Sequence, residues 1–156
     1  MSFLESEFSE NCVFCRIIKG KAPAYTVYEN DRAIAFLDTF PIVPGHTLVM
    51  PKSHFSGMTN VPVDLIASVF DVAKLISRSF YSMGYTAVNY LVNEGADAGQ
   101  VIFHVHCHLI PRRPDDGLDL RMKRSRLESK IMETTAYGIR SAIKNSVSTD
   151  MPEADL

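Results

Sequence analysis

Three of the five histidines in this chain of 156 residues fall within one short run, His-Val-His-Cys-His. In a β-strand alternate side chains point to one face, so His104, His106 and His108 would lie side by side. A neutral imidazole can attack phosphorus, hydrogen-bond phosphate oxygens or bind a metal ion. The alternative is a row of polar side chains on a solvated sheet face, which the glycine-rich loop just before the run makes less favourable.

Two cysteines near the N-terminus offer a second chemistry. Cys12 and Cys15 have the Cys-x-x-Cys spacing of half a zinc site, a spacing that redox dithiols and pairs of simple buried thiols share. A closed tetrahedral site needs two more ligands, and His46 and His54 are the candidates outside the histidine run. With three cysteines in all, the chain has no even disulfide framework.

Composition limits the classes of protein to consider. A hydrophobic fraction of 46% and a charged fraction of 22% are ordinary for one globular domain. The net charge of -2 argues against a broad surface for duplex nucleic acid, though not against a small nucleotide. No apolar run reaches the roughly 20 residues of a membrane span, and the acidic N-terminus is unlike a signal peptide. We therefore expect no membrane partner and a cytoplasmic protein, with the nucleus as an alternative.

Hydrophobic periodicity and turn residues predict the elements that position these side chains. The expected elements are a short helix at 14–19, strands at 25–29, 33–37 and 47–51, a long helix at 63–83, and strands at 86–92 and 101–110, the last one stopped by Pro111. Because strands outnumber helices that could cross between parallel strands, we expect an α+β fold with an antiparallel five-stranded sheet. The expected organisation is a flexible arm at 1–10, a domain at 11–118 and a C-terminal helical extension at 119–156.

Three segments of the chain resemble the histidine triad superfamily. They are CVFCRIIKGKAPAYTVYENDRAIAF, FLDTFPIVPGHTLVMPKSH and NEGADAGQVIFHVHCHLIPR, and together they run from about residue 12 to residue 113. The last contains the triad pattern itself, in which each histidine is followed by an apolar residue. The first resembles the zinc-carrying members of the branch that includes the histidine triad nucleotide-binding proteins.

The resemblance implies a nucleotidyl hydrolase or transferase acting on nucleoside phosphoramidates or adenylylated substrates. In this family the middle histidine is the nucleophile, so His106 would form a covalent nucleotidyl-histidine intermediate. Water would then release a nucleoside monophosphate. His108 and Gln100 match positions that contact the α-phosphate, and Asn93 matches the contact on the bridging or leaving side.

The resemblance also implies a binding site for a purine nucleotide similar to AMP. Asp38 matches the carboxylate that accepts hydrogen bonds from the ribose hydroxyls, although on the residues alone it could be a turn residue. Phe14, Ile17 and Phe36 match the apolar base pocket, although such side chains more often pack in a core. Gly99 would let the backbone approach a phosphate closely.

In zinc-bearing relatives of this branch, the triad's first histidine and a histidine of the second segment join the cysteine pair. The resemblance therefore implies Cys12, Cys15, His54 and His104 as ligands of zinc. With all four positions filled by protein, the metal would be structural. His46 is then left as a surface or packing residue. Relatives pair as homodimers, with the long helix as the interface element, and a monomeric mass in solution would contradict that expectation.

One residue departs from the family pattern. Phosphoramidase members often place Ser or Thr after the glutamine, where this chain has Val101, which cannot donate a proton. The substrate is therefore open, with asymmetric cleavage of dinucleoside polyphosphates as one alternative. Two further alternatives are a nucleotide-binding module with vestigial catalysis and a metal-dependent hydrolase whose three triad histidines hold a catalytic zinc.

Overall fold

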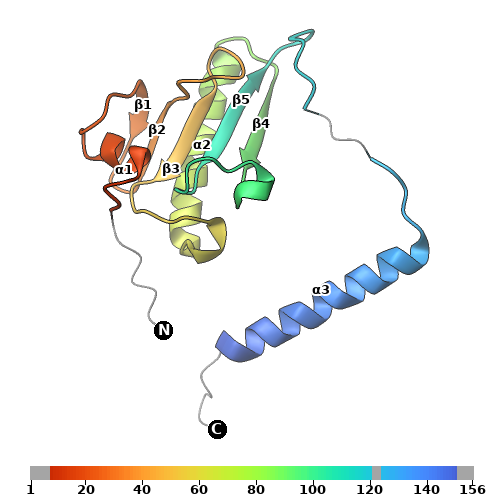
Figure 1. The fold of residues 1–156 in the computed structure, drawn as a ribbon. Coiled ribbons are helices and arrows are strands. Elements are labelled where there is room, and N and C mark those ends of the chain that lie inside the picture. Colours follow the sequence, from red (N-terminus) through yellow and green to blue (C-terminus); the bar gives the residue numbers. More distant parts are fainter. Residues whose placement is uncertain (1–7, 121–123, 151–156) are drawn as a thin grey trace. The chain divides into compact units, whose positions relative to one another are not determined.

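The computed structural model describes residues 8–120 and 124–150 and has the expected α+β architecture (Figure 1). Its elements are α1 (Val13–Ile18), β1 (Thr26–Glu29), β2 (Ala33–Leu37), β3 (Thr47–Pro51), α2 (Val63–Ser82), β4 (Ala87–Val92), β5 (Cys107–Arg112) and α3 (Ser129–Asp150), with short 3-10 turns at Met58–Asn60 and Ala96–Ala98.

The five strands form one antiparallel sheet in the order β1-β2-β3-β5-β4. β5 begins at Cys107, within the histidine run, and its first half lies between β3 and β4. His108 is paired with Leu48 on one side and with Leu91 on the other. The strand that carries the end of the triad is thus fixed from both sides. β4 is an edge strand of this sheet. Whether the chain forms the expected homodimer is not tested by these contacts, and the homodimer stays a prediction.

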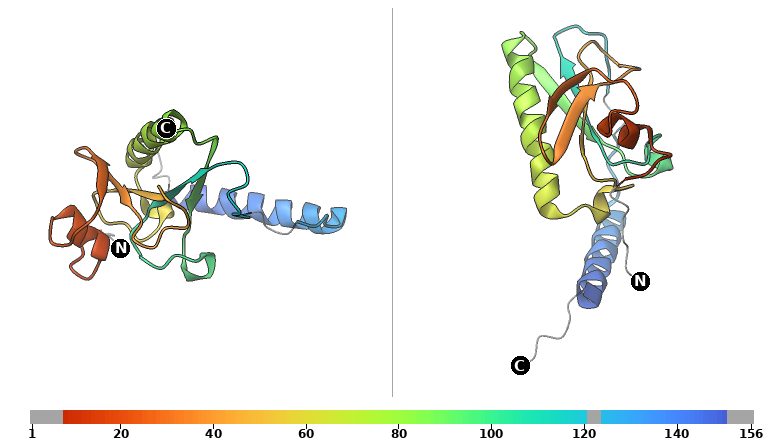
Figure 2. Two further views of the ribbon diagram at one scale, coloured as in Figure 1. Left: turned by 90° about the horizontal axis from the view of Figure 1, so that it is seen from above. Right: turned by 90° about the vertical axis from the view of Figure 1, so that its left-hand side faces the viewer.

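The two faces of the sheet are covered by different helices, α2 on one and α1 on the other (Figure 2). Side chains alternate between these faces along each strand. The α2 side holds Ala33, Ala35, Val49, Cys107 and Leu109 against Val69, Val72, Ala73, Ile76 and Phe80. The α1 side holds Ile34, Phe36, Leu48 and Met50 against Cys12, Phe14 and Cys15. Because both faces are covered, the sequences of β2 and β3 are continuous apolar runs and do not alternate between apolar and polar residues.

The last strand differs from its prediction at both ends. It spans Cys107–Arg112 rather than 101–110, so His104 and His106 precede it. The backbone N–H of Val105 donates to the carbonyl of Phe55 at 2.6 Å, which takes this segment out of the sheet's ladder. Pro111 lies inside the strand instead of stopping it. Beyond Leu109, β5 pairs with β4 alone, and a residue without an N–H is tolerated there as on an edge.

The triad still alternates as expected, despite this correction. Val105 packs with Phe55 and Leu65, and Cys107 packs on the α2 side of the sheet. The rings of His104 and His106 instead meet Phe14 of α1, at centroid distances of 6.0 and 5.2 Å.

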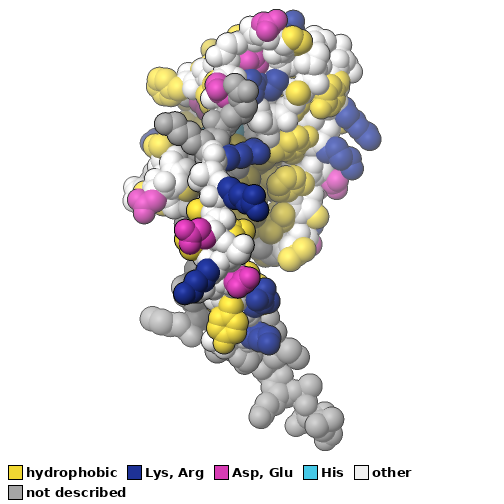
Figure 3. All heavy atoms as spheres, turned by 90° about the vertical axis from the view of Figure 1, so that its right-hand side faces the viewer, with side chains coloured by type: hydrophobic (Ala, Val, Ile, Leu, Met, Phe, Trp, Pro, Cys, Tyr) yellow, Lys and Arg dark blue, Asp and Glu magenta, His cyan; other side chains and the backbone are white. Residues whose placement is uncertain are grey.

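The chain divides into two compact units, the first ending at Gly117 and the second starting at Leu118. The second unit contains α3. Acidic and basic side chains are interspersed along this helix with exposed apolar ones, of which Ile139 is an example (Figure 3). Of the expected N-terminal arm, residues 1–7 lie outside the described residues, and Phe8 packs against the cluster around α1. Within the described chain, no helix is both long and apolar enough to span a bilayer.

Candidate active site

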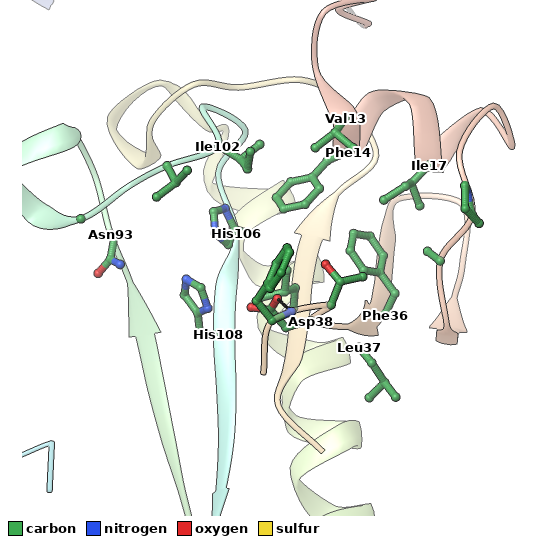
Figure 4. A pocket seen from close by; sticks show the side chains of 17 residues that line it. Val13, Phe14, Ile17, Phe36, Leu37, Asp38, Asn93, Ile102, His106 and His108 are labelled. Carbon is green, nitrogen blue, oxygen red and sulfur yellow. Dashed lines mark hydrogen bonds between the residues drawn. The ribbon is translucent and has the colours of Figure 1, made fainter. Parts of the chain in front are cut away.

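A cavity of about 500 Å³ opens beside the end of the triad (Figure 4). Its wall is built from α1, the end of β2 with the loop after it, the residue just after β4, and residues between Gly99 and His108. This volume is within the range of about 300–1,000 Å³ that is usual for small-molecule sites. Elements far apart in the sequence therefore meet at one concave site.

His106 lies in the wall of this cavity with one ring nitrogen committed to the backbone. Its Nδ1 is 2.6 Å from the carbonyl oxygen of His104. A carbonyl only accepts, so Nδ1 carries the hydrogen, and Nε2 of the neutral ring keeps its lone pair. Burial lowers the pKa of His106, with its side chain only 7% exposed. The ring is thus neutral with a fixed tautomer, and the lone pair on its Nε2 is available to a ligand.

His108 is oriented by a second hydrogen bond that the sequence did not predict. Its Nδ1 lies 3.0 Å from Nε2 of His46. The Nδ1 of His46 accepts from the backbone N–H of Ile42 at 3.2 Å, so neutral His46 carries its hydrogen on Nε2 and donates to His108. The hydrogen of neutral His108 then lies on its own Nε2. In this arrangement His108 lines the cavity as a hydrogen-bond donor.

His46 is therefore more than the spare surface or packing residue expected from the sequence. It is 2% exposed, and burial lowers its pKa. Asp38 lies 3.6 Å from its Nδ1. Nothing local in the sequence marks this role, because His46 lies just before β3 and His108 lies on β5, 62 residues later.

The residues expected to bind a nucleotide converge on the cavity. Phe14, Ile17, Phe36, Asp38, Asn93 and Gly99 all line it, together with His106 and His108. The rings of Phe14 and Phe36 meet edge to face, with centroids 5.5 Å apart. Gly99 has a φ of +86°, a left-handed conformation that side chains rarely adopt, so the loop needs glycine where it forms the cavity wall.

Gln100 differs from the other expected site residues, since its side chain does not line the cavity. It is 5% exposed, and its amide is used by the backbone of the surrounding loops. Its Oε1 accepts from the N–H of Gly95 at 2.8 Å, and its Nε2 donates to the carbonyls of Ser56 and Ile102. In this structure Gln100 thus holds the loop beside the cavity in position.

A second cluster brings together the four residues expected to bind zinc. The Nδ1 of His104 lies 3.7 and 3.6 Å from the sulfurs of Cys12 and Cys15, and the Nδ1 of His54 lies 3.3 Å from Cys15. A tetrahedral ion with Zn–S of about 2.3 Å and Zn–N of about 2.0 Å needs nitrogen and sulfur ligands roughly 3.6 Å apart. The spacing and the chemistry of this donor set therefore fit zinc.

The tautomer of His104 also suits metal binding. Its Nε2 lies 2.9 Å from the carbonyl oxygen of Pro51, so Nε2 carries the hydrogen and Nδ1 presents its lone pair to the cysteines. The residue is 0% exposed, and burial lowers its pKa to about 4. His104 thus points its ring into the cysteine cluster while its carbonyl holds His106.

The three triad histidines do not form one metal site. Among the described residues, His104 groups with the cysteines and His54, whereas His108 groups with Asp38 and His46. His106 belongs to neither group. This separation argues against a catalytic zinc held by the whole triad.

Comparison with known proteins relates the chain to one family. A family model described as the HIT domain matches residues 19–115. The chain is 42% identical over 114 residues to an adenylylsulfatase, HINT3, of Arabidopsis thaliana, covering 72% of this chain but 58% of that relative.

Solved structures add to the comparison. A histidine triad nucleotide-binding protein from Candida albicans is similar with a TM-score of 0.78 and 28% identity, covering 87% of this chain and 99% of that one. A zinc-bound histidine triad family protein from Mycobacterium smegmatis has a TM-score of 0.68 and 36% identity, covering 85% and 97%.

The hydrogen-bond chain through His46 predicts the charge state of His108. Burial, followed by the neighbouring His106 and His46, lowers the pKa of His108 to about 4. Nitrogen-detected NMR, with the signal assigned by its absence in His108→Gln, should show a neutral ring protonated on Nε2 from pH 8 down to 5. Between pH 6.5 and 4 this histidine is protonated more in the unfolded chain than in the folded one. The free energy of unfolding should therefore fall as the pH drops through that window. Titration near pH 6.5, or the Nδ1-protonated tautomer, would contradict the arrangement.

Proposed function

Because this chain belongs to the histidine triad (HIT) family, we propose that it is a nucleotidyl hydrolase that works through a covalent intermediate on His106. The observation that carries this proposal is the hydrogen bond from Nδ1 of His106 to the carbonyl of His104. It leaves Nε2 of a buried, neutral ring as the nucleophile in the wall of the cavity.

The first step is attack of Nε2 of His106 on the α-phosphorus of a bound nucleotide. A nitrogen–phosphorus bond forms, and the bond from phosphorus to the leaving group breaks, with its electron pair going to the leaving group. The ring becomes positively charged, and its Nδ1–H donates more strongly to the carbonyl of His104. The carboxylate of Asp38 favours that positive charge. Water then attacks the same phosphorus and loses a proton to solvent. The nitrogen–phosphorus bond breaks with its electron pair returning to Nε2 of His106, and a nucleoside monophosphate is released.

The other residues in the cavity wall bind and orient the substrate. His108, held by His46, donates from Nε2 to a non-bridging phosphate oxygen, where it stabilises the charge that develops during attack. Asp38 accepts from the ribose hydroxyls, and Asn93 contacts the leaving side. The base lies among Phe14, Ile17 and Phe36, which offer apolar and aromatic contact with little discrimination among purines.

Zinc is the proposed structural cofactor, held by Cys12, Cys15, His54 and His104. Burial raises the pKa of the Cys15 thiol, so a cation beside it is needed for the thiolate that metal binding requires. The metal would join α1 and the segment carrying His54 to the residue whose carbonyl holds the nucleophile. That role is compatible with the zinc-bound relative from Mycobacterium smegmatis.

The substitution His106→Asn tests the covalent mechanism. Asparagine is a smaller polar side chain whose amide can donate as Nδ1 does, but it has no nucleophilic nitrogen, so turnover of an adenylylated substrate should fall by about a thousandfold or more. Calorimetric titration with AMP should still give binding within a few-fold of the parent protein, which separates loss of chemistry from loss of fold. Full turnover by this variant on every substrate offered would exclude His106 as the nucleophile.

The substitution Cys15→Ser tests the zinc site. The purified parent should contain about one zinc per chain by elemental analysis, and the variant should lose the metal and unfold at a lower temperature. Cys107→Ala is the matched control, because Cys107 packs on the α2 side of the sheet and should leave the zinc content unchanged. Loss of turnover on chelation with an unchanged melting temperature would instead make the metal catalytic.

A further inference from the structure

The helix α3, which the proposed function does not use, has two sides of opposite character. Successive residues of a helix are rotated by about 100° around its axis, so the position of each side chain follows from its number. One sector of about 120° contains the large apolar side chains, and we call it the apolar sector. Its members are Ile131, Met132, Ile139 and Ile143. The charged side chains fall in a separate sector of about 80°. They are Lys130, Glu133, Arg140 and Lys144.

The side chains of the apolar sector are left largely in contact with water. Each of the four is between 48% and 57% exposed. Keeping a row of aliphatic groups in water is unfavourable, and the free-energy cost grows with the apolar area exposed. An apolar phase or surface that covers the row would therefore stabilise it.

The part of the chain that contains α3 also differs in charge from the rest. Residues 121–149 contain seven Lys or Arg and two Glu, a net charge of +5. The remaining residues, 1–120 and 150–156, contain nine Lys or Arg and sixteen Asp or Glu, a net charge of -7. Four of the seven basic residues lie in the segment RMKRSR, just before α3. An anionic surface would therefore attract this part of the chain in preference to the rest.

These two properties together favour one kind of surface over the others. A nucleic acid would neutralise the basic residues but would leave the apolar sector in water. The α3 helix of a second copy would cover the apolar sector but would bring together two regions that each carry a charge of +5. A bilayer that contains anionic lipids offers negative headgroups to the basic residues and an apolar interior to the aliphatic ones.

We propose that α3 binds to the surface of an anionic lipid bilayer, with the apolar sector among the acyl chains. The long side chains of Lys130, Arg140 and Lys144 then reach the headgroups from the polar side of the helix. Such binding is peripheral and needs no membrane-spanning helix. It replaces the expectation of no membrane partner, which considered spanning segments and a signal peptide. It is also independent of the chemistry proposed for His106.

Flotation of the full chain with lipid vesicles tests the proposal. One set of vesicles is pure phosphatidylcholine, and the other is an equal mixture of phosphatidylcholine and phosphatidylserine. The partition coefficient should be about tenfold or more higher for the anionic vesicles, and it should fall as the salt concentration rises.

Substitutions on the two sides of α3 separate the apolar contribution from the charged one. Ile139→Gln keeps helix propensity but removes an apolar group, so it should lower partitioning to the anionic vesicles several-fold. Lys144→Glu should lower it as well, because it brings a negative charge to the headgroups. The matched control is Lys74→Glu, the same charge reversal at an exposed position on α2, which should leave partitioning unchanged within about twofold.

Tryptophan fluorescence can report which side of α3 enters the bilayer, because the chain contains no tryptophan of its own. Ile139→Trp introduces a reporter in the apolar sector. Tyr137→Trp introduces one on the opposite side of the helix, where Tyr137 is exposed. With anionic vesicles, the emission of the Ile139→Trp protein should shift to shorter wavelength and be quenched by brominated acyl chains. The Tyr137→Trp protein should show neither change.

Three other results would each overturn the proposal. Equal partitioning to both kinds of vesicle, or equal quenching of the two reporters, would mean that α3 does not bind a bilayer in this orientation. Blue-shifted emission of the Ile139→Trp protein without lipid, with a dimer that Ile139→Gln dissociates in light scattering, would mean that a second copy covers the apolar sector. Tighter binding to a single-stranded oligonucleotide than to anionic vesicles, unaffected by Ile139→Gln, would instead indicate a nucleic-acid site.

Discussion

The hydrogen bond from the ring of His106 to the carbonyl of His104 is the interaction on which the rest of this site depends. At 2.6 Å it fixes which nitrogen of His106 can react and which way that nitrogen faces. The carbonyl is itself fixed, because the ring of His104 is buried between Pro51 and the cysteine cluster. The proposed nucleophile and the proposed zinc site therefore both depend on His104, the first through its backbone carbonyl and the second through its side chain.

Burial keeps the histidines neutral. The pKa values of His46, His106 and His108 are all lowered, mainly because the rings are removed from water. Phe14 contributes by packing edge-on against His106. A neutral imidazole can attack phosphorus, whereas a protonated one has no lone pair to offer. The same burial that excludes water thus maintains the reactive form at neutral pH.

The sequence predicted the antiparallel sheet, the two faces of the triad and eight of the residues that line the cavity, because these follow from local periodicity and from the family resemblance. Two contacts between residues distant in the chain were not predicted, because no local pattern marks them. The start of β5 depends on the bond between Val105 and Phe55, and the role of His46 depends on the pairing of β3 with β5. Gln100 has the residue type expected of a phosphate ligand, yet three backbone groups around it use its amide.

The most direct test of the account is the stereochemistry of hydrolysis at the α-phosphorus. The measurement uses a nucleotide made chiral at that atom with sulfur and one oxygen isotope, hydrolysed in water carrying another isotope, with the product's configuration read by phosphorus NMR. A covalent intermediate on His106 requires two in-line displacements, each of which inverts the phosphorus, so the account predicts overall retention. Overall inversion would mean that water attacks the substrate directly, and it would contradict the central role given to His106.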